Sequence, residues 1–456
     1  MLIINRRFRF IPLVAIVALA ATTCLAAPSA NAATKTKVKA KWGTSIDVSG
    51  GQFSRSGVLD VAARPNGGAF AVGIVGGTGK FGSTTLRGPD GVGVNQFVGR
   101  LDSKGRWKWA VVTAGGQTLQ QSVAAAPDGG VYVCSVETFT QQGDRLDLPY
   151  GFIAKYSARG EEEWVSTVGA GQFAGCSSLA VAPDGSVFAT GEGWRPGESS
   201  GSGTAYVAKI ASNGAWQWFT LMGGSRGAGS GITVLSDGRV AATGRFKVSG
   251  AFGSTTLSDE STDGSTTPGG AFYGNGYVVV LDPQSGVVTD VEHLASPNLV
   301  WPSSIASTVN GSYVVAGTFR EEFSVGTLTE NGPTRADNRG FLAYRGGSGN
   351  WKWSTSIGEP NGGGSFNAVT FTGDKRIIAG GDFGIDKNGI IALKMTGRQL
   401  KSVVWRNGEA DIDSLSSTGR RGFVVGGFQF GDWKLGKKVQ LMGTGTSGTG
   451  YVAEFK

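Results

Sequence analysis

Three aspartates are placed where this sequence could support acid–base chemistry. Asp60 lies near the start of one alternating segment, and Asp411 and Asp413 lie near the start of the last comparable segment of the chain. Two carboxyl groups a few ångströms apart can serve a hydrolase or a lyase as general acid and base. Cleft carboxylates are also common without any catalytic role, so both interpretations stay open.

The single histidine limits other chemistry. A Ser-His-Asp hydrolase would have to use His293, and the sequence has no Gly-x-Ser-x-Gly motif at a strand-to-helix turn. One histidine also excludes a histidine-rich metal site. We therefore expect His293 to be a strand residue with an ordinary side-chain partner.

Two glycine-rich stretches resemble ligand loops without completing them. Gly77, Gly79 and Gly82 fit Gly-x-Gly-x-x-Gly, but no helix follows to hold a phosphate. Residues 382–389 partly imitate a calcium loop, with Gly384 where an oxygen ligand is needed. We predict no metal and no cofactor.

Cysteines and loop tryptophans form the remaining candidates. The repeat pattern described below puts Cys134 and Cys176 on the same face of adjacent units, so they form either a disulfide or two buried free thiols. Four loop residues interrupt Gly/Ser-rich segments and could bind carbohydrate or peptide, or could pack onto their own sheet: Trp194, Arg195, Trp301 and Trp433.

The elements that position these residues belong to one repeated unit. Residues 177–218 read SSLAVAPDGSVFATG, a loop, and AYVAKIASNGAWQW, which predicts four strands ending in tryptophan. Asn-Gly or Asp-Gly turns mark most copies, and the pattern occurs seven times. With 77 glycines and almost no helical periodicity, the sequence predicts an all-β protein.

The last copy lacks its fourth strand, and the N-terminal segment offers a replacement. The chain stops at GYVAEFK, whereas residues 37–46 read KVKAKWGTSI and place Trp42 in the tryptophan position. We predict a single seven-bladed β-propeller of four-stranded antiparallel blades over residues 33–456, closed by the N-terminal strand. The recurrent tryptophans are expected to pack between blades.

The repeats resemble those of a known group. APDGSVFATG followed by AYVAKIASNGAWQW is similar to the repeats of bacterial exported β-propeller proteins called SBBP-type. This resemblance covers residues 35–456 and implies a propeller with no common chemistry. Residues 102–109 also resemble, more distantly, the tryptophan-docking repeats of quinoprotein-like propellers.

The N-terminus and the charge bear on location. Arg6, Arg7 and Arg9 precede an apolar run, and Ala30-Asn31-Ala32 fits signal peptidase, so residues 1–32 are predicted to be a secretory signal peptide. Lipoprotein anchoring at Cys24 is a minor alternative. The small basic excess of the remaining chain is spread along the sequence, so we expect no nucleic-acid partner.

We therefore expect a secreted or cell-surface monomer without a transmembrane segment. Its predicted function is that of a non-enzymatic binding or scaffolding surface for a protein or an envelope polysaccharide. A glycan-binding, lectin-like module is the first alternative, and a lyase or hydrolase using Asp60, Asp411 and Asp413 is the second.

Overall fold

In the computed structural model, Thr36–Lys456 form one compact unit. The signal-peptide prediction concerns residues outside the described part. The structure describes residues 39–50, 54–88, 93–115, 121–137, 150–168, 174–193, 203–224, 226–261, 274–332, 337–359, 363–385, 387–406, 410–419, 421–435, 439–443 and 448–456.

The described residues form antiparallel β-sheets and no α-helix. The first three sheets are β3 (Arg55–Ala63), β4 (Ala69–Gly76), β7 (Asn95–Leu101) and β8 (Trp107–Gly115); β9 (Gln121–Ala125), β10 (Val131–Glu137), β11 (Tyr150–Tyr156) and β12 (Glu162–Thr167); and β13 (Ala174–Val181), β14 (Val187–Gly193), β15 (Thr204–Ile210) and β16 (Trp216–Met222). No described helix is long and apolar enough to cross a membrane.

The same order continues along the chain. The next sheets are β17 (Ala228–Val234), β18 (Val240–Phe246), β21 (Asn275–Leu281) and β22 (Val288–Ala295); β23 (Leu299–Ser307), β24 (Tyr313–Arg320), β27 (Arg339–Arg345) and β28 (Trp351–Ile357); and β29 (Ser365–Thr372), β30 (Arg376–Asp382), β31 (Lys387–Lys394) and β32 (Gln399–Arg406). The last sheet combines β33 (Ser414–Ser417), β34 (Phe423–Gln429), β37 (Thr449–Phe455) and the N-terminal β1 (Ala40–Ser45).

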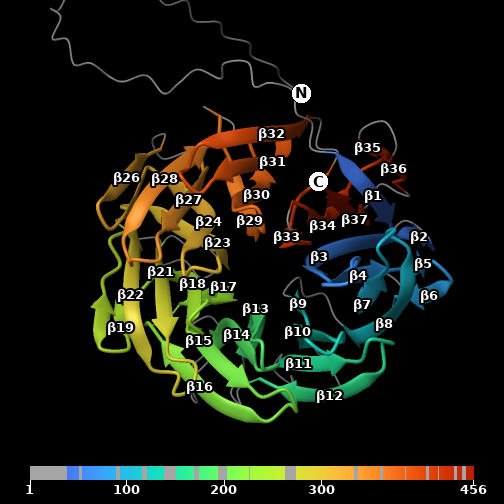
Figure 1. The fold of residues 1–456 in the computed structure, drawn as a ribbon, viewed down its shortest axis with the longest axis horizontal. Helices are drawn as coiled ribbons and strands as arrows, with labels where there is room; N and C mark the ends of the chain where they lie inside the picture. The colour runs from blue at the N-terminus through green and yellow to red at the C-terminus, as the bar shows by residue number, and fades with distance from the viewer. Residues whose placement is uncertain are drawn as a thin grey trace, which may run out of the picture. The chain divides into compact units, whose positions relative to one another are not determined.

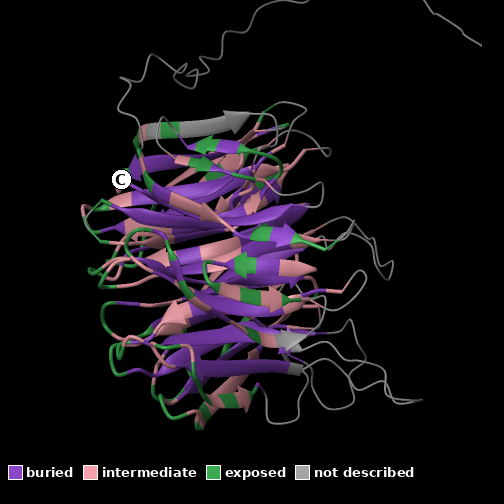
Figure 2. Cartoon of the chain, turned by 90° about the vertical axis from the view of Figure 1, so that its right-hand side faces the viewer, coloured by how far each residue is buried: buried purple, intermediate pink, exposed green. Residues whose placement is uncertain are grey.

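The first strands of successive sheets contact one another around a common axis (Figure 1). Contacts run from β3 to β9, β13, β17, β23, β29 and β33, and β33 contacts β3 in turn. Strands two and three are buried on both faces, as in β4 and β15, because each sheet is packed between two others (Figure 2). This explains their almost continuous aliphatic and aromatic sequence.

The predicted fourth strand of the last sheet is present. β1 pairs antiparallel with β37, from Ala40 opposite Phe455 to Ser45 opposite Tyr451. Lys41 Nζ lies 2.9 Å from Glu454 Oε2, and Trp42 Nε1 donates to the same oxygen at 2.6 Å. The two ends of the described chain are therefore joined by backbone pairing and by a charged hydrogen-bond cluster.

Small hairpins extend from three of the loops between second and third strands. They are β5 (Thr78–Phe81) with β6 (Thr84–Arg87), β19 (Gly250–Phe252) with β20 (Thr255–Leu257), and β25 (Glu322–Val325) with β26 (Leu328–Asn331). β2 (Asp47–Ser49) pairs with β5, and β35 (Trp433–Leu435) pairs with β36 (Val439–Leu441). β25 also pairs with β22 of the preceding sheet, while Phe323 stacks on Phe341 of its own sheet with a centroid separation of 4.4 Å.

Candidate functional site

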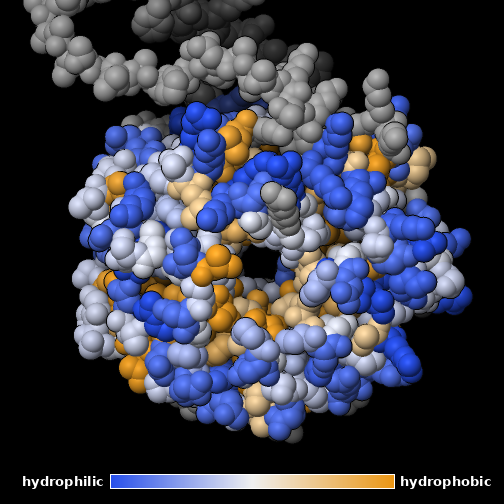
Figure 3. Space-filling model, viewed as in Figure 1, coloured by the Kyte–Doolittle hydropathy of each residue, from blue (hydrophilic) through white to orange (hydrophobic). Residues whose placement is uncertain are grey.

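The described chain has a pocket of about 530 Å³ on the axis, bounded by the first strand of every sheet. Its opening lies in the middle of the face shown in Figure 3. Small residues dominate these strands where they converge on the axis, and many of the lining residues carry hydroxyl groups. Two carboxyl groups, those of Asp60 and Asp413, join this lining.

A β-bulge recurs in the first strands and turns an additional residue toward the axis. The strand register shifts between Val58 and Asp60, and equivalent shifts occur in β13, β17, β23 and β29. A bulge leaves one residue outside the ladder and re-aims its side chain. These bulge residues all line the pocket: Leu59, Ser177, Ser230, Ser303 and Asn367.

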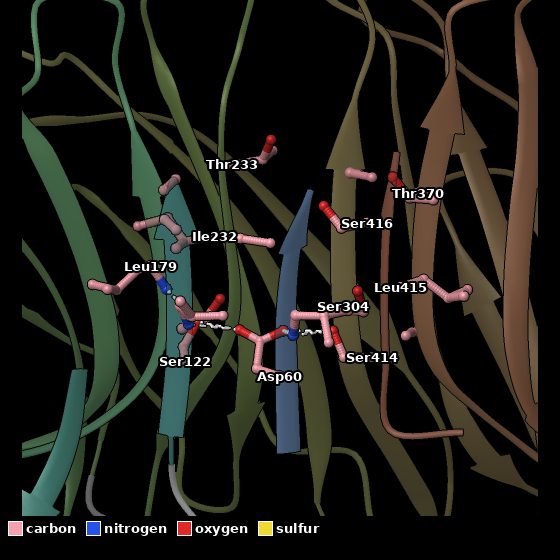
Figure 4. A pocket seen from close by; sticks show the side chains of 18 of the residues that line it. Asp60, Ser122, Leu179, Ile232, Thr233, Ser304, Thr370, Ser414, Leu415 and Ser416 are labelled. Carbon is pink, nitrogen blue, oxygen red and sulfur yellow. Dashed lines mark hydrogen bonds between the residues drawn. The ribbon is translucent and has the colours of Figure 1, made fainter. Parts of the chain in front are cut away.

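Asp60 connects three sheets. Its Oδ2 accepts hydrogen bonds from Ser122 Oγ and Val123 N of β9, both at 2.8 Å, and its Oδ1 accepts from Ser414 Oγ of β33 (Figure 4). The backbone N–H of Val61 also donates to Oδ1 at 2.8 Å. Burial raises the pKa of Asp60, and these hydrogen bonds oppose that rise.

The other two predicted acids lie immediately before β33. Asp411 accepts a 2.9 Å hydrogen bond from Asn388 Nδ2, and burial raises its pKa. Asp413 Oδ2 is buried and has no hydrogen-bond partner in the structure. Burial, and secondly the charge of Asp411, raise the pKa of Asp413 to about 7. The structure therefore brings Asp60 and Asp413 to one pocket, whereas Asp411 is not among the pocket's lining residues.

His293 is an ordinary strand residue, as expected. It lies in β22, and its Nε2 is 2.8 Å from Asn275 Oδ1. Burial lowers its pKa, with Glu260 and Asp259 acting in the opposite direction.

The predicted loop aromatics differ in their surroundings. Trp194 and Arg195 lie outside the described residues. Trp301 is the third residue of the axial strand β23 and is 42% exposed, with the guanidinium carbon of Arg245 4.0 Å from its ring centroid. Such stacking is a cation–π interaction.

Trp433 takes the packed alternative, because it is only 1% exposed. The β35–β36 hairpin packs against β1, and Trp433 packs edge-on against Tyr451 of β37 with a centroid separation of 4.9 Å. A large apolar ring gains more from this cover than from exposure to water. Trp433 therefore cannot present its face to a ligand in this conformation.

Cys134 and Cys176 form a disulfide, with Cα atoms 5.8 Å apart. The bond joins β10 to β13 of the next sheet and resolves the alternative of two free thiols. Groups of three or more acidic, histidine or cysteine side chains arranged for a metal do not occur among the residues that the structure covers.

Sequence reasoning missed the serine partners of Asp60 and the bulge residues. Ser122 and Ser414 occupy the same repeat position as Asp60, each opposite the fourth residue of the second strand of its sheet. An alignment of the copies on their second strands would have shown the three side chains at one level of the axis.

Comparison with known proteins leaves the family open. No family model and no curated protein matches this chain. A protein of unknown function from Dyadobacter fermentans shares 10% identity, with a TM-score of 0.44 over 92% of this chain and 99% of its own. Prolyl oligopeptidase B from Galerina marginata, solved with a 25mer macrocyclization substrate, shares 12% identity and a TM-score of 0.44 over 83% of this chain. The present chain covers 48% of that enzyme's length.

Proposed function

We propose that this protein is an exported, non-enzymatic seven-bladed β-propeller of the SBBP-repeat type that provides a binding or scaffolding surface at the cell envelope or outside the cell. The successive contacts of the first strands support the blade order. The pairing of β1 with β37 supports closure through the N-terminal strand. Residues 1–32 are the proposed secretory signal, and the mature chain is proposed to act as a monomer.

The observation that carries this proposal is the environment of Asp60. This acid accepts hydrogen bonds from Ser122 on one side and Ser414 on the other, so it connects the first, second and last sheets. Its lone pairs are used by two hydroxyls and two backbone N–H groups. A carboxylate held in this way stabilises the ring, and the ring supports the variable loops. The same carboxylate is poorly placed to take up a proton from a substrate.

The disulfide supports export. Cys134–Cys176 links sheets that are adjacent on the ring. Structural disulfides persist in oxidising compartments and are rare in the cytosol. The basic, apolar and small-residue segments at the start of the sequence are consistent with the same destination.

Expression of the full chain in a bacterium tests the location and the binding together. N-terminal sequencing of the exported protein is expected to give Ala33. The exported protein is then incubated with purified envelope polysaccharide and, separately, with solubilised envelope proteins, and saturable retention of a defined protein would support the scaffold. Retention of the chain in the cytoplasm with its first residues intact would refute export.

A glycan-binding module is the second candidate, favoured by the exposure of Trp301. Its ring is partly open to solvent beside the guanidinium of Arg245, and such rings stack on sugars. The test compares polysaccharide retention by the natural chain and by Trp301→Ala. Equal retention would reject this candidate.

A further inference from the structure

Three of the five bulge residues around the axis connect neighbouring sheets through their side chains. Ser230 Oγ donates to the carbonyl oxygen of Pro302 at 2.5 Å, and Ser303 Oγ donates to that of Phe366 at 2.5 Å. Asn367 Nδ2 donates to the carbonyl oxygen of Ile412 at 3.0 Å. In each case the acceptor carbonyl lies on the first strand of the next sheet, at or immediately before its own bulge.

Asp413 occupies the corresponding position in the last sheet. Its N–H donates to Gly426 O, and Gly426 is also the ladder partner of Ser414, so two residues face one as in a bulge. The equivalent acceptor on the first sheet is the carbonyl of Val58, which precedes the bulge residue Leu59. An ionised carboxylate has no hydrogen to donate there. When ionised, Asp413 is therefore unlike Ser230, Ser303 and Asn367, which each donate a hydrogen bond to the next sheet.

The surroundings of Asp413 leave its charge uncompensated. The pocket lining includes no lysine, arginine or histidine from the described residues. Asp413 Oδ2 is buried without a partner, which is costly for a carboxylate in a protein interior. Asp60, the other acid of the pocket, has four donors and needs none from a ligand.

We propose that the axial pocket binds a small hydroxylated or aliphatic amine, whose ammonium group pairs with Asp413. An ammonium brings a positive charge and three N–H donors, so it can serve the carboxylate and a neighbouring carbonyl or hydroxyl at once. Ser and Thr hydroxyls on the surrounding strands can bond the ligand's own hydroxyls. A pocket of about 530 Å³ has the size of ordinary small-molecule sites. This inference goes beyond the proposed scaffold function, which concerns the loops.

Calorimetric titration of the exported chain at about pH 7.5 tests the proposal. Glucosamine and putrescine are the amine probes, N-acetylglucosamine is the uncharged control, and calcium chloride tests for a metal site. At least one amine is expected to bind while N-acetylglucosamine does not. Binding of glucosamine alone would indicate an amino-sugar source, and binding of putrescine alone a polyamine source.

Two variants assign the effect to Asp413. Asp413→Asn is expected to weaken amine binding by about tenfold or more, because a charged hydrogen bond is lost. Asp237→Asn removes one exposed negative charge away from the pocket and is expected to leave the affinity unchanged. Asp413→Ser, which restores the donor found at Ser303, replaces the asparagine variant if that variant does not fold.

Several results would overturn the proposal. They are equal affinity of the natural chain and Asp413→Asn, equal binding of glucosamine and N-acetylglucosamine, binding of calcium alone, and no measurable heat with either amine. None of these outcomes bears on whether the loops bind an envelope partner, so the proposed function is tested separately.

Discussion

The indole nitrogen of Trp109 donates a 3.1 Å hydrogen bond to the carbonyl oxygen of Ala158. Trp109 belongs to the outer strand of one sheet, and Ala158 to the turn between the third and fourth strands of the next. The ring also covers Gly160, which has a φ of +89°. The pairs Trp164–Ser212, Trp218–Pro283 and Trp353–Met395 repeat this hydrogen bond. These tryptophans therefore join four of the outer strands to the neighbouring sheet.

Gly160→Ala is predicted to destabilise the protein more than Gly129→Ala. Both glycines have a φ of +89°, so each variant incurs the same left-handed penalty of about 1 kcal/mol. A Cβ at Gly160 would lie 2.8 Å from the Trp109 ring, whereas one at Gly129 would meet nothing within 4 Å. Overpacking should add roughly 1–3 kcal/mol, measured by denaturant unfolding. Equal losses would show that the ring moves aside at no cost.

Removal of the Cys134–Cys176 disulfide is predicted to lower the free energy of unfolding by about 2–4 kcal/mol. The bridge spans 42 positions, so it restricts a long loop of the unfolded chain. The measurement compares denaturant unfolding of the natural chain, with and without reductant, with that of the Cys134→Ala/Cys176→Ala variant. The variant should not respond to reductant. An unchanged midpoint of the reduced natural chain would contradict this prediction.

The stability of the natural chain relative to Asp413→Asn is predicted to fall as pH rises from about 4 to 7. Burial, aided by Asp411, raises the pKa of Asp413 from 3.8 to about 7. The folded state therefore holds a proton that the unfolded state has released in this range, and ionisation weakens folding by up to about 1.4 kcal/mol per pH unit.

Denaturant unfolding of the natural chain and of Asp413→Asn at pH 5 and at pH 7 checks the Asp413 prediction. The quantity compared is the difference in the free energy of unfolding between the two proteins at each pH. Asp60 on β3 and Asp411 also have pKa values raised by burial, whereas Tyr451 on β37 has a pKa raised well above its usual range and stays neutral between pH 5 and 7. Asp60 remains in both proteins, so its contribution cancels to first order, and the difference reports Asp413 together with its effect on Asp411. A pH-independent difference between natural chain and variant would show that Asp413 titrates normally.

Trp433→Ala is predicted to lower the stability of the protein far more than Trp301→Ala. Trp433 is buried against Tyr451, so its truncation should cost about 3–5 kcal/mol of stability. Trp301 is 42% exposed, and its truncation should cost less than about 1 kcal/mol. Thermal unfolding of both variants is the measurement. A large loss for Trp301→Ala would mean that its stacking on Arg245 is structural and would weaken the glycan-binding alternative.

The repeat pattern predicted the strands and turns within each sheet. Alternation and Asp-Gly turns predicted the strands, and comparison of the copies predicted that residues near Trp42 pair with the last strand. The turn at Gly373-Asp374 departs from the rule, because Lys375 adopts the positive φ there.

Contacts between sheets could not be predicted in the same way. Asp60 and Ser414 are 354 positions apart, and their hydrogen bond depends on how far each bulge rotates the strand. The attachment of β25 to the preceding sheet depends likewise on the path of a loop. Trp433 is buried because its hairpin packs against β1 and β37, and the glycine and serine of the loop sequence do not specify that contact.

Trp42→Ala is predicted to cost as much stability as Trp164→Ala, about 2–4 kcal/mol. Trp42 lies on the N-terminal β1, whereas Trp164 lies on the internal strand β12. The Trp42 ring covers Gly105 as the Trp164 ring covers Gly214, so β1 has the packing of an integral fourth strand. Trp42 Nε1 donates to Glu454, which is buried and would keep only Lys41 as a side-chain partner.

Unfolding of the two tryptophan variants, with size-exclusion chromatography, distinguishes an integral β1 from a loosely added strand. Loss of β1 would leave the outer edge of β37 unpaired, and open strand edges associate with other chains. An integral β1 therefore gives similar losses in both variants and concentration-dependent association when residues 33–46 are deleted. A much smaller loss for Trp42→Ala, with a deletion variant that stays monomeric and stable, would show that the ring holds together without its N-terminal strand.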